Sequence, residues 1–100
     1  MKEADLGKVF LFACPWDWTF VGRFVGFNGH RIVIHDAGYF TRTGQTFELL
    51  CAKGFTAETQ FHAFVSSENP DGAIFIENEG PVFRWTADWP QKAKAQAKRR

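Results

Sequence analysis

The residues best suited to bind a charged ligand lie at positions 39–44, in the segment YFTRTG. The guanidinium fork of Arg42, the hydroxyl of Thr43 and the exposed backbone amide of Gly44 can together hold a phosphate or carboxylate. The neighbouring ring of Tyr39 can stack on a base or another planar group. The same residues are also typical of an ordinary solvated turn, so the sequence supports both interpretations.

Tryptophan side chains offer further rings to such a ligand. Trp16 and Trp18 alternate with Phe20 in a short aromatic connection. Their rings would either line a pocket or cap one end of a small barrel. The residues predicted to bind the ligand, with the stacking rings first and the anion-binding residues after them, are Trp16, Trp18, Tyr39, Arg42, Thr43 and Gly44. Further candidates for a mixed aromatic and basic site are Arg23, Arg84 and Trp85.

No catalytic motif accompanies these residues. Catalysis needs a nucleophile with a base, paired carboxylates or a metal cluster, and the sequence contains none of these as a motif. The nearest acid–base pair is His35-Asp36, whose side chains would point to opposite faces of a strand. Cys14 and Cys51 have neither CxxC nor zinc-site spacing. We therefore predict a binding protein without enzymatic activity, cofactor or metal.

Composition indicates one domain with many aromatic side chains. The chain has 100 residues, of which 45% are hydrophobic and 17% are aromatic. A single hydrophobic core is feasible at this length. The high aromatic share favours a stacking site or a self-associating surface, although a small barrel packed with Phe accounts for it equally well. We expect residues 1–90 to form this domain.

Charge is distributed unevenly along the chain. The net charge is +1, and residues 91–100 hold five Lys or Arg and no acid, which leaves −4 on the preceding ninety residues. An acidic body argues against a broad nucleic-acid-binding face, because phosphate affinity depends on clustered basic side chains. The basic tail is predicted to be disordered, and by itself would give weak, salt-sensitive binding to RNA or DNA.

The sequence predicts a cytoplasmic protein that does not associate with membranes. The apolar run at 9–14 is too short for a signal peptide and is followed directly by Pro15. No stretch approaches the roughly eighteen apolar residues that a membrane span needs. Two cysteines are too few for a disulfide scaffold and are typical of a reducing compartment.

The strongest structural signal is a β-hairpin at residues 18–37, closed by Asn28-Gly29. An Asn-Gly pair supplies the positive φ angles of a type I′ turn. Both faces of the first strand are largely apolar, which is typical of a small barrel or of a strand against a neighbouring subunit. By alternation, one face holds Trp18, Phe20, Gly22, Phe24 and Gly26, and the other holds Thr19, Val21, Arg23, Val25 and Phe27.

Local patterns predict the remaining elements. Residues 45–53 have helical spacing, with Thr43 or Thr46 as N-cap and Gly54 as the stop signal. Residues 39–44 are expected to form a turn. Strands are expected at 8–14, 60–66, 73–78 and 82–86, with 73–78 pairing with 60–66. The predicted fold is a mainly β, small antiparallel barrel of about five to six strands with one short helix.

A barrel with a glycine-bent central hairpin resembles SH3-like and Sm-like domains in outline. Gly22 and Asp36 match part of the Sm pattern, but a second RNA-contact motif is not recognisable. A closer likeness, to small uncharacterised phage proteins, runs from residue 18 to residue 54. The positions that carry this likeness are Gly22, Gly29, Ile32, Ile34, Asp36-Ala37, Gly44, Leu50 and Gly54.

The likeness to phage proteins implies a function. Small phage proteins of this kind include homo-oligomeric decoys that sequester nucleotide immune signals, typically in pockets between subunits. The resemblance thus implies a non-catalytic, anti-defence protein that binds a small phosphate-bearing, nucleotide-like ligand in the cytoplasm of an infected bacterium. Two alternatives stay open. One is an Sm-like module that binds RNA or DNA through the basic tail, and the other is a protein-interaction inhibitor or virion-assembly module anchored by exposed Phe and Trp.

Overall fold

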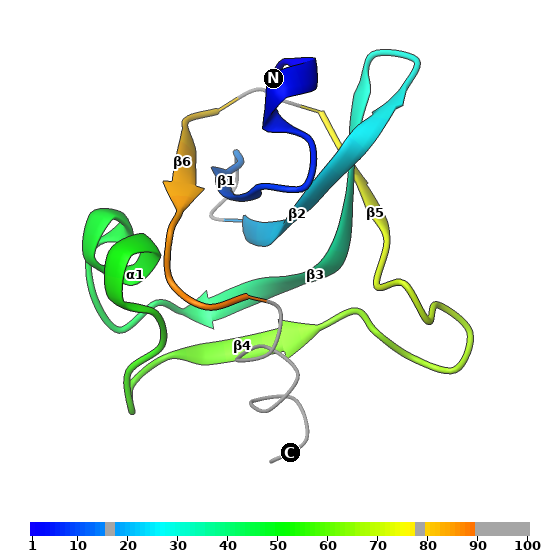
Figure 1. The fold of residues 1–100 in the computed structure, drawn as a ribbon. Coiled ribbons are helices and arrows are strands. Elements are labelled where there is room, and N and C mark those ends of the chain that lie inside the picture. Colours follow the sequence, from blue (N-terminus) through cyan, green and yellow to red (C-terminus); the bar gives the residue numbers. More distant parts are fainter. Residues whose placement is uncertain (16–17, 78–79, 90–100) are drawn as a thin grey trace.

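The computed structural model describes residues 1–15, 18–77 and 80–89 (Figure 1). Two predictions, on Trp16 and on the basic tail at 91–100, fall outside the described residues. The elements in chain order are a 3₁₀ turn η1 (Glu3–Asp5), β1 (Val9–Ala13), β2 (Thr19–Asn28), β3 (Arg31–Arg42), α1 (Phe47–Lys53), β4 (Gln60–Ala63), β5 (Ile74–Ile76) and β6 (Val82–Trp85).

The strands form one six-stranded antiparallel sheet in the order β4-β3-β2-β1-β6, with β5 also paired to β3. Figure 1 shows α1 beside β6 at one side of this sheet. β4 and β6 are the two ends of the strand order, and the described residues do not pair them. The predicted mainly β, antiparallel fold with one short helix is confirmed. The predicted closure into a barrel is not.

One edge of β3 is shared by two short strands. β4 pairs with residues 38–42 of β3, and β5 pairs with residues 32–34. The prediction that these two strands pair with each other is therefore wrong. In the gap between them, the N–H of Asp36 donates to the carbonyl of Asp71, and the N–H of Ala37 donates to that of Gly72. The segment between β4 and β5 thus follows the edge of β3 instead of forming a simple hairpin turn.

The hairpin of β2 and β3 is confirmed, with Gly29 at φ 63° in its turn. The expected alternation of faces fails near the turn, because the register of β2 against β3 shifts between Phe24 and Gly26. An extra residue in one strand reverses the face that the following side chains occupy. Phe27 consequently pairs with Ile32, and its ring lies edge-on to that of Phe24 with 5.3 Å between centroids.

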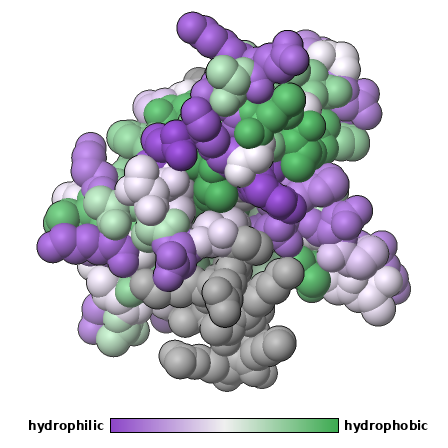
Figure 2. All heavy atoms as spheres, viewed as in Figure 1, coloured by the Kyte–Doolittle hydropathy of each residue, from purple (hydrophilic) through white to green (hydrophobic). Residues whose placement is uncertain are grey.

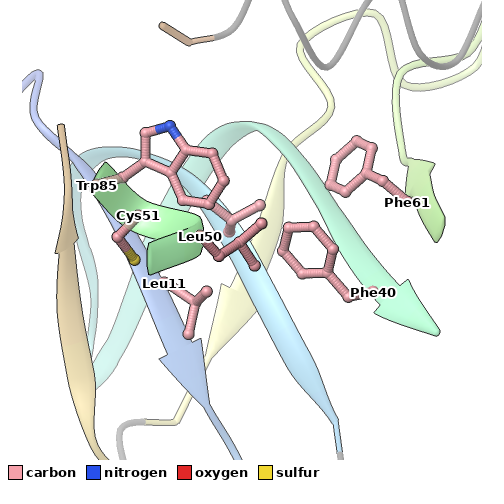
Figure 3. Close-up of a cluster of buried hydrophobic side chains, with 7 residues drawn as sticks. Leu11, Phe40, Leu50, Cys51, Phe61 and Trp85 are labelled. Atoms are coloured by element: carbon pink, nitrogen blue, oxygen red, sulfur yellow. The ribbon is translucent and has the colours of Figure 1, made fainter. Parts of the chain in front are cut away.

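Each face of the sheet carries its own hydrophobic core, and β1 contributes to both. Leu11 belongs to a first cluster that α1 covers with Leu50 and Cys51 (Figure 3), whereas Phe10 and Phe12 belong to a second cluster. Residues that alternate along a strand point to opposite faces, which explains this division. The apolar character of both hairpin faces therefore has an explanation within one chain. The first cluster comprises Leu11, Val21, Phe40, Leu50, Cys51, Phe61 and Trp85, and the second Phe10, Phe12, Phe24, Ile32, Ile34, Ala37 and Ile76.

The helix α1 has the predicted caps and begins two residues later than predicted. The hydroxyl of Thr46 accepts a hydrogen bond from the Leu49 N–H at 3.3 Å, which satisfies one of the free donors of the first turn. Gly54 ends the helix with φ 85°, and its N–H donates to the Leu50 carbonyl. Gln45, the first residue of the predicted helix, lies before α1, and its side chain donates to the Gly54 carbonyl at 2.8 Å.

The predicted turn at 39–44 is wrong for its first four residues, because β3 continues through Arg42. Pairing with β4 extends the strand: Phe40 lies opposite Phe61, and Arg42 opposite Gln60. Tyr39 and Phe40 therefore point to different faces of the sheet. The register of β3 against β4 then shifts between Phe40 and Arg42, so this alternation does not extend to Arg42.

Candidate functional site

An aromatic cavity of about 450 Å³ lies where β1 ends and β2 begins. Phe20 and Tyr39, which line it, are register partners across β2 and β3. The chain connection after β1 and the segment after β4 complete the wall. The lining residues are Cys14, Pro15, Trp18, Phe20, Tyr39 and Phe64.

The four rings of the aromatic cavity hold one another in place. Trp18 stacks on Phe20 with centroids 5.7 Å apart and planes inclined by 3°, and it meets Tyr39 edge-on at 5.6 Å. Phe64 lies 6.3 Å from Phe20 and 5.5 Å from Tyr39. Trp18 is nevertheless 49% exposed. A ring that is packed on one side and open on the other is a preformed stacking surface, which a planar ligand can use at little ordering cost.

A polar cluster supports Tyr39 from the side of β4. The Tyr39 ring stacks on the imidazole of His62, with centroids 4.8 Å apart and planes inclined by 20°. Thr41 Oγ1 donates to Gln60 Oε1 at 3.2 Å and lies 3.1 Å from His62 Nε2. These contacts hold the imidazole ring in place beneath Tyr39.

A second cavity, of about 470 Å³, has a mixed polar and apolar lining, and we call it the threonine cavity. Thr19 and Phe40, which line it, alternate along β2 and β3 with Phe20 and Tyr39 of the aromatic cavity. The two cavities therefore lie on opposite faces of the sheet. Cys14 lines both, so they adjoin at the end of β1. The lining residues of the threonine cavity are Ala13, Cys14, Thr19, Phe40, Thr41, Arg42, Thr43 and Phe47.

The structure separates residues that the sequence analysis placed in one site. Trp18 and Tyr39 lie in the aromatic cavity, as a stacking role requires. Arg42 and Thr43 line the threonine cavity instead. Trp16 lies outside the described residues. A ligand that uses both sets must extend around the end of β1.

No protein-family model, curated protein or solved structure matches the chain. The geometry of the two cavities is therefore the basis for a functional proposal. Within the ranges that the structure describes, no group of three or more His, Cys, Asp or Glu side chains is arranged to hold a metal ion. Neither of the described helices is long and apolar enough to cross a membrane.

The loop after β3 uses most of its polar groups within the fold. Arg42 Nη1 lies 3.6 Å from Glu58 Oε2, and both side chains are exposed. Thr43 Oγ1 donates to the Gln45 carbonyl at 2.9 Å. Gly44 has φ 79°, and a Cβ there would come within 3.0 Å of the Glu58 Cβ, so the glycine serves a close backbone approach. A carboxylate thus stands beside the guanidinium that the sequence analysis assigned to an anion.

The further candidates lie in neither cavity. Arg23 Nη2 makes an ion pair with Asp36 Oδ2 at 2.7 Å. The Arg84 guanidinium lies over the ring of Phe10, 5.9 Å from its centroid. Trp85 is 2% exposed and belongs to the first core cluster. All three thus have roles that hold the sheet together.

Sequence reasoning missed Phe64 and Thr19 as site residues. Phe64 was expected on a strand, but its contact with Tyr39 depends on the pairing of β4 with β3, which is not a local property. Thr19 appeared only as one of five residues on a strand face. The one available signal was its polar hydroxyl on a face that otherwise consists largely of apolar side chains.

Proposed function

We propose that the chain is a non-catalytic binding protein that takes up the planar ring of a small nucleotide-like ligand in the aromatic cavity. The observation that carries this proposal is the convergence of four aromatic side chains, with Trp18 half-exposed, on one cavity. Stacking a nucleobase on an aromatic side chain contributes about 1–3 kcal/mol and tolerates different bases. The volume of about 450 Å³ lies within the range of roughly 300–1,000 Å³ that is typical of small-molecule sites.

The biological setting of this proposal comes from the resemblance to small phage proteins. It supports a homo-oligomeric, SH3-like barrel in outline that sequesters a nucleotide signal of host defence in the cytoplasm of an infected bacterium. An aromatic cavity favours a planar ring whatever the origin of the chain.

Native mass spectrometry tests the proposal directly. The purified chain is incubated with a pool of cyclic and linear nucleotides, and the oligomer mass and any bound nucleotide are measured together. Trp18→Ala should weaken nucleotide binding about tenfold or more, since it removes a stacking partner. Phe75→Ala is the matched control, because Phe75 is 53% exposed on β5 and lines neither cavity. The proposal fails if the wild-type chain binds no nucleotide, or if Trp18→Ala binds as tightly as the wild type.

A protein-interaction role is the second candidate, and exposed rings favour it. Phe27 is 54% exposed and Phe75 is 53% exposed, both on the part of the sheet formed by β2, β3 and β5. Figure 2 shows apolar side chains gathered on the surface beside β2 and β5. Exposed aromatic side chains are frequent anchors at protein interfaces. With this function the effects reverse: Phe75→Ala lowers affinity for the partner protein, and nucleotides do not bind.

The Sm-like alternative depends on the basic tail, which lies outside the described residues. Deleting residues 91–100 tests it. Nucleic-acid affinity that falls steeply with salt and disappears with the tail would support this function.

A further inference from the structure

One hydroxyl in the threonine cavity donates no hydrogen bond to a described residue. Thr43 Oγ1 donates to the Gln45 carbonyl at 2.9 Å, and Thr41 Oγ1 donates to the Gln60 side chain at 3.2 Å. A hydroxyl has a single proton, so neither of these two can also donate to a ligand. The side chain of Thr19 makes no hydrogen bond to any residue in the described ranges. Of the three threonines in the lining, only Thr19 therefore has a donor to offer.

Thr19 is well placed for this role because it is held firmly. It is only 8% exposed, begins β2, and lies between Ala13 of β1 and Phe40 of β3 in the strand register. A side chain fixed by its neighbouring strands loses little further freedom when it binds a ligand.

Arg42 brings positive charge to the same cavity. Its Nη1 lies 3.6 Å from Glu58 Oε2, and the two side chains are 61% and 70% exposed. An ion pair this exposed is weak, and the guanidinium has five N–H donors, so Arg42 can turn toward an anion at little cost. The Glu58 carboxylate limits the attraction, which makes the uncharged donor Thr19 the more important of the two for orientation.

We infer that the threonine cavity binds a phosphate group, with Thr19 donating a hydrogen bond to a phosphate oxygen and Arg42 supplying the charge. Cys14 lines both cavities, so the phosphate of a nucleotide would lie across the end of β1 from its base. The inference deepens the proposed function and rests on it for the ring half of the ligand only. Free phosphate and a nucleotide phosphate present the same oxygens, and the experiment separates them.

Isothermal titration calorimetry tests the inference with the four ribonucleoside 5′-monophosphates, the corresponding nucleosides and inorganic phosphate. Thr19→Val keeps the shape of the side chain and removes the hydroxyl, and it should weaken nucleotide binding about tenfold while changing nucleoside binding less than about twofold. Thr19→Ser restores the donor and should restore affinity. Thr86→Val is the matched control, since Thr86 lines neither cavity and its hydroxyl makes only a 3.4 Å contact with the Cys51 carbonyl. Thermal unfolding of each variant verifies that it folds.

The possible outcomes distinguish the inference from the proposed function. The inference is overturned if nucleotides bind Thr19→Val as tightly as they bind the wild type. It is also overturned if nucleosides bind the wild type as tightly as the corresponding nucleotides do. In both cases the proposed ring site in the aromatic cavity is unaffected. If phosphate binds in a way that depends on Thr19 but nucleosides do not bind, the inference is supported and the proposed function is overturned. If the wild-type chain binds none of the probes, both are wrong.

Discussion

Arg23 and Asp36 join β2 to β3 through an ion pair in which Arg23 Nη2 lies 2.7 Å from Asp36 Oδ2. Asp36 has φ 51°, which among non-glycine residues is unusual and is best tolerated by Asp and Asn. Its carbonyl accepts a hydrogen bond from the indole N–H of Trp89 at 3.1 Å, and its own N–H donates to Asp71. One residue thus connects the central hairpin to the β4–β5 segment and to the end of the described chain.

Replacing Asp36 with Asn should lower the free energy of unfolding by about 1–2 kcal/mol, because the charged partner of Arg23 is lost. Asn tolerates the positive φ, so the change isolates the charge from the backbone strain. Arg23 Nε is already buried without a partner, which leaves the guanidinium few alternatives. Urea unfolding measures the effect. Glu77→Gln is the control, since Glu77 lies 3.5 Å from Arg31 in an exposed pair, and its loss should cost less than about 0.5 kcal/mol. Equal effects for the two variants would contradict the assigned role of Asp36.

Local signals in the sequence were sufficient for the hairpin and the helix. Asn28-Gly29 and Thr46 act through neighbouring residues only, and both lie where the turn and the N-cap were expected. The two-cavity site did not follow from the sequence, because it depends on where β3 ends. With residues 39–44 as a turn, Tyr39 and Arg42 would share one loop. Pairing with β4, which is distant in sequence, keeps them in a strand, where Tyr39 lines the aromatic cavity and Arg42 lines the threonine cavity.

The shared edge of β3 also escaped prediction for a non-local reason. A turn between two strand patterns favours a hairpin, and 68–72 has the residues of such a turn. The competing interaction is the backbone pairing of Asp36 and Ala37 with residues 71 and 72, which holds the segment against β3. It depends on the bend at Asp36, and a single positive φ at a non-glycine residue leaves no pattern in the sequence.

Gly38→Ala should destabilise the protein more than Gly22→Ala. A Cβ at Gly38 would lie 2.6 Å from the backbone oxygen of His62 and would also overlap the ring of Phe61, so β3 and β4 would have to separate. A Cβ at Gly22 would come closest to the end of the Ile34 side chain at 2.8 Å, and it would lie 3.0 Å from the Ala37 Cβ and 3.1 Å from the backbone oxygen of His35, which are milder contacts than those at Gly38. Overpacking of this kind costs typically about 1–3 kcal/mol, and we expect Gly38→Ala at or above the upper end. Thermal unfolding gives the order, and a reversed order would show that β4 yields more easily than Ile34.

Leu50→Ala should lower the free energy of unfolding by about 3–5 kcal/mol and leave the chain partly unfolded near body temperature. Leu50 is fully buried in the first core cluster, where α1 covers the sheet. Truncating a buried Leu removes its transfer free energy and leaves a cavity, and this loss is a large share of the stability of a 100-residue domain. Leu49→Ala is the matched control, because Leu49 is the preceding helix residue and 45% exposed. Circular dichroism melts of the pair should differ by more than about 10 °C; similar melting temperatures would place Leu50 outside the core.

Stability should fall at high pH because of Cys51. Burial, and to a smaller extent the negative charge of Glu48, raises the pKa of its thiol from 9.0 to about 11. Between these values the unfolded chain releases the proton while the folded chain keeps it. The free energy of unfolding therefore falls as pH rises from about 9 to about 11, and this group has no effect below pH 9.

Urea midpoints measured across that range should fall less steeply for Cys51→Ala than for the wild type, whatever the packing cost of the substitution at pH 8. Glu48→Gln removes only the smaller cause, so it should change the dependence of the urea midpoint on pH only slightly. Parallel pH profiles for the wild type and Cys51→Ala would mean that Cys51 ionises in the folded chain as it does in the unfolded one.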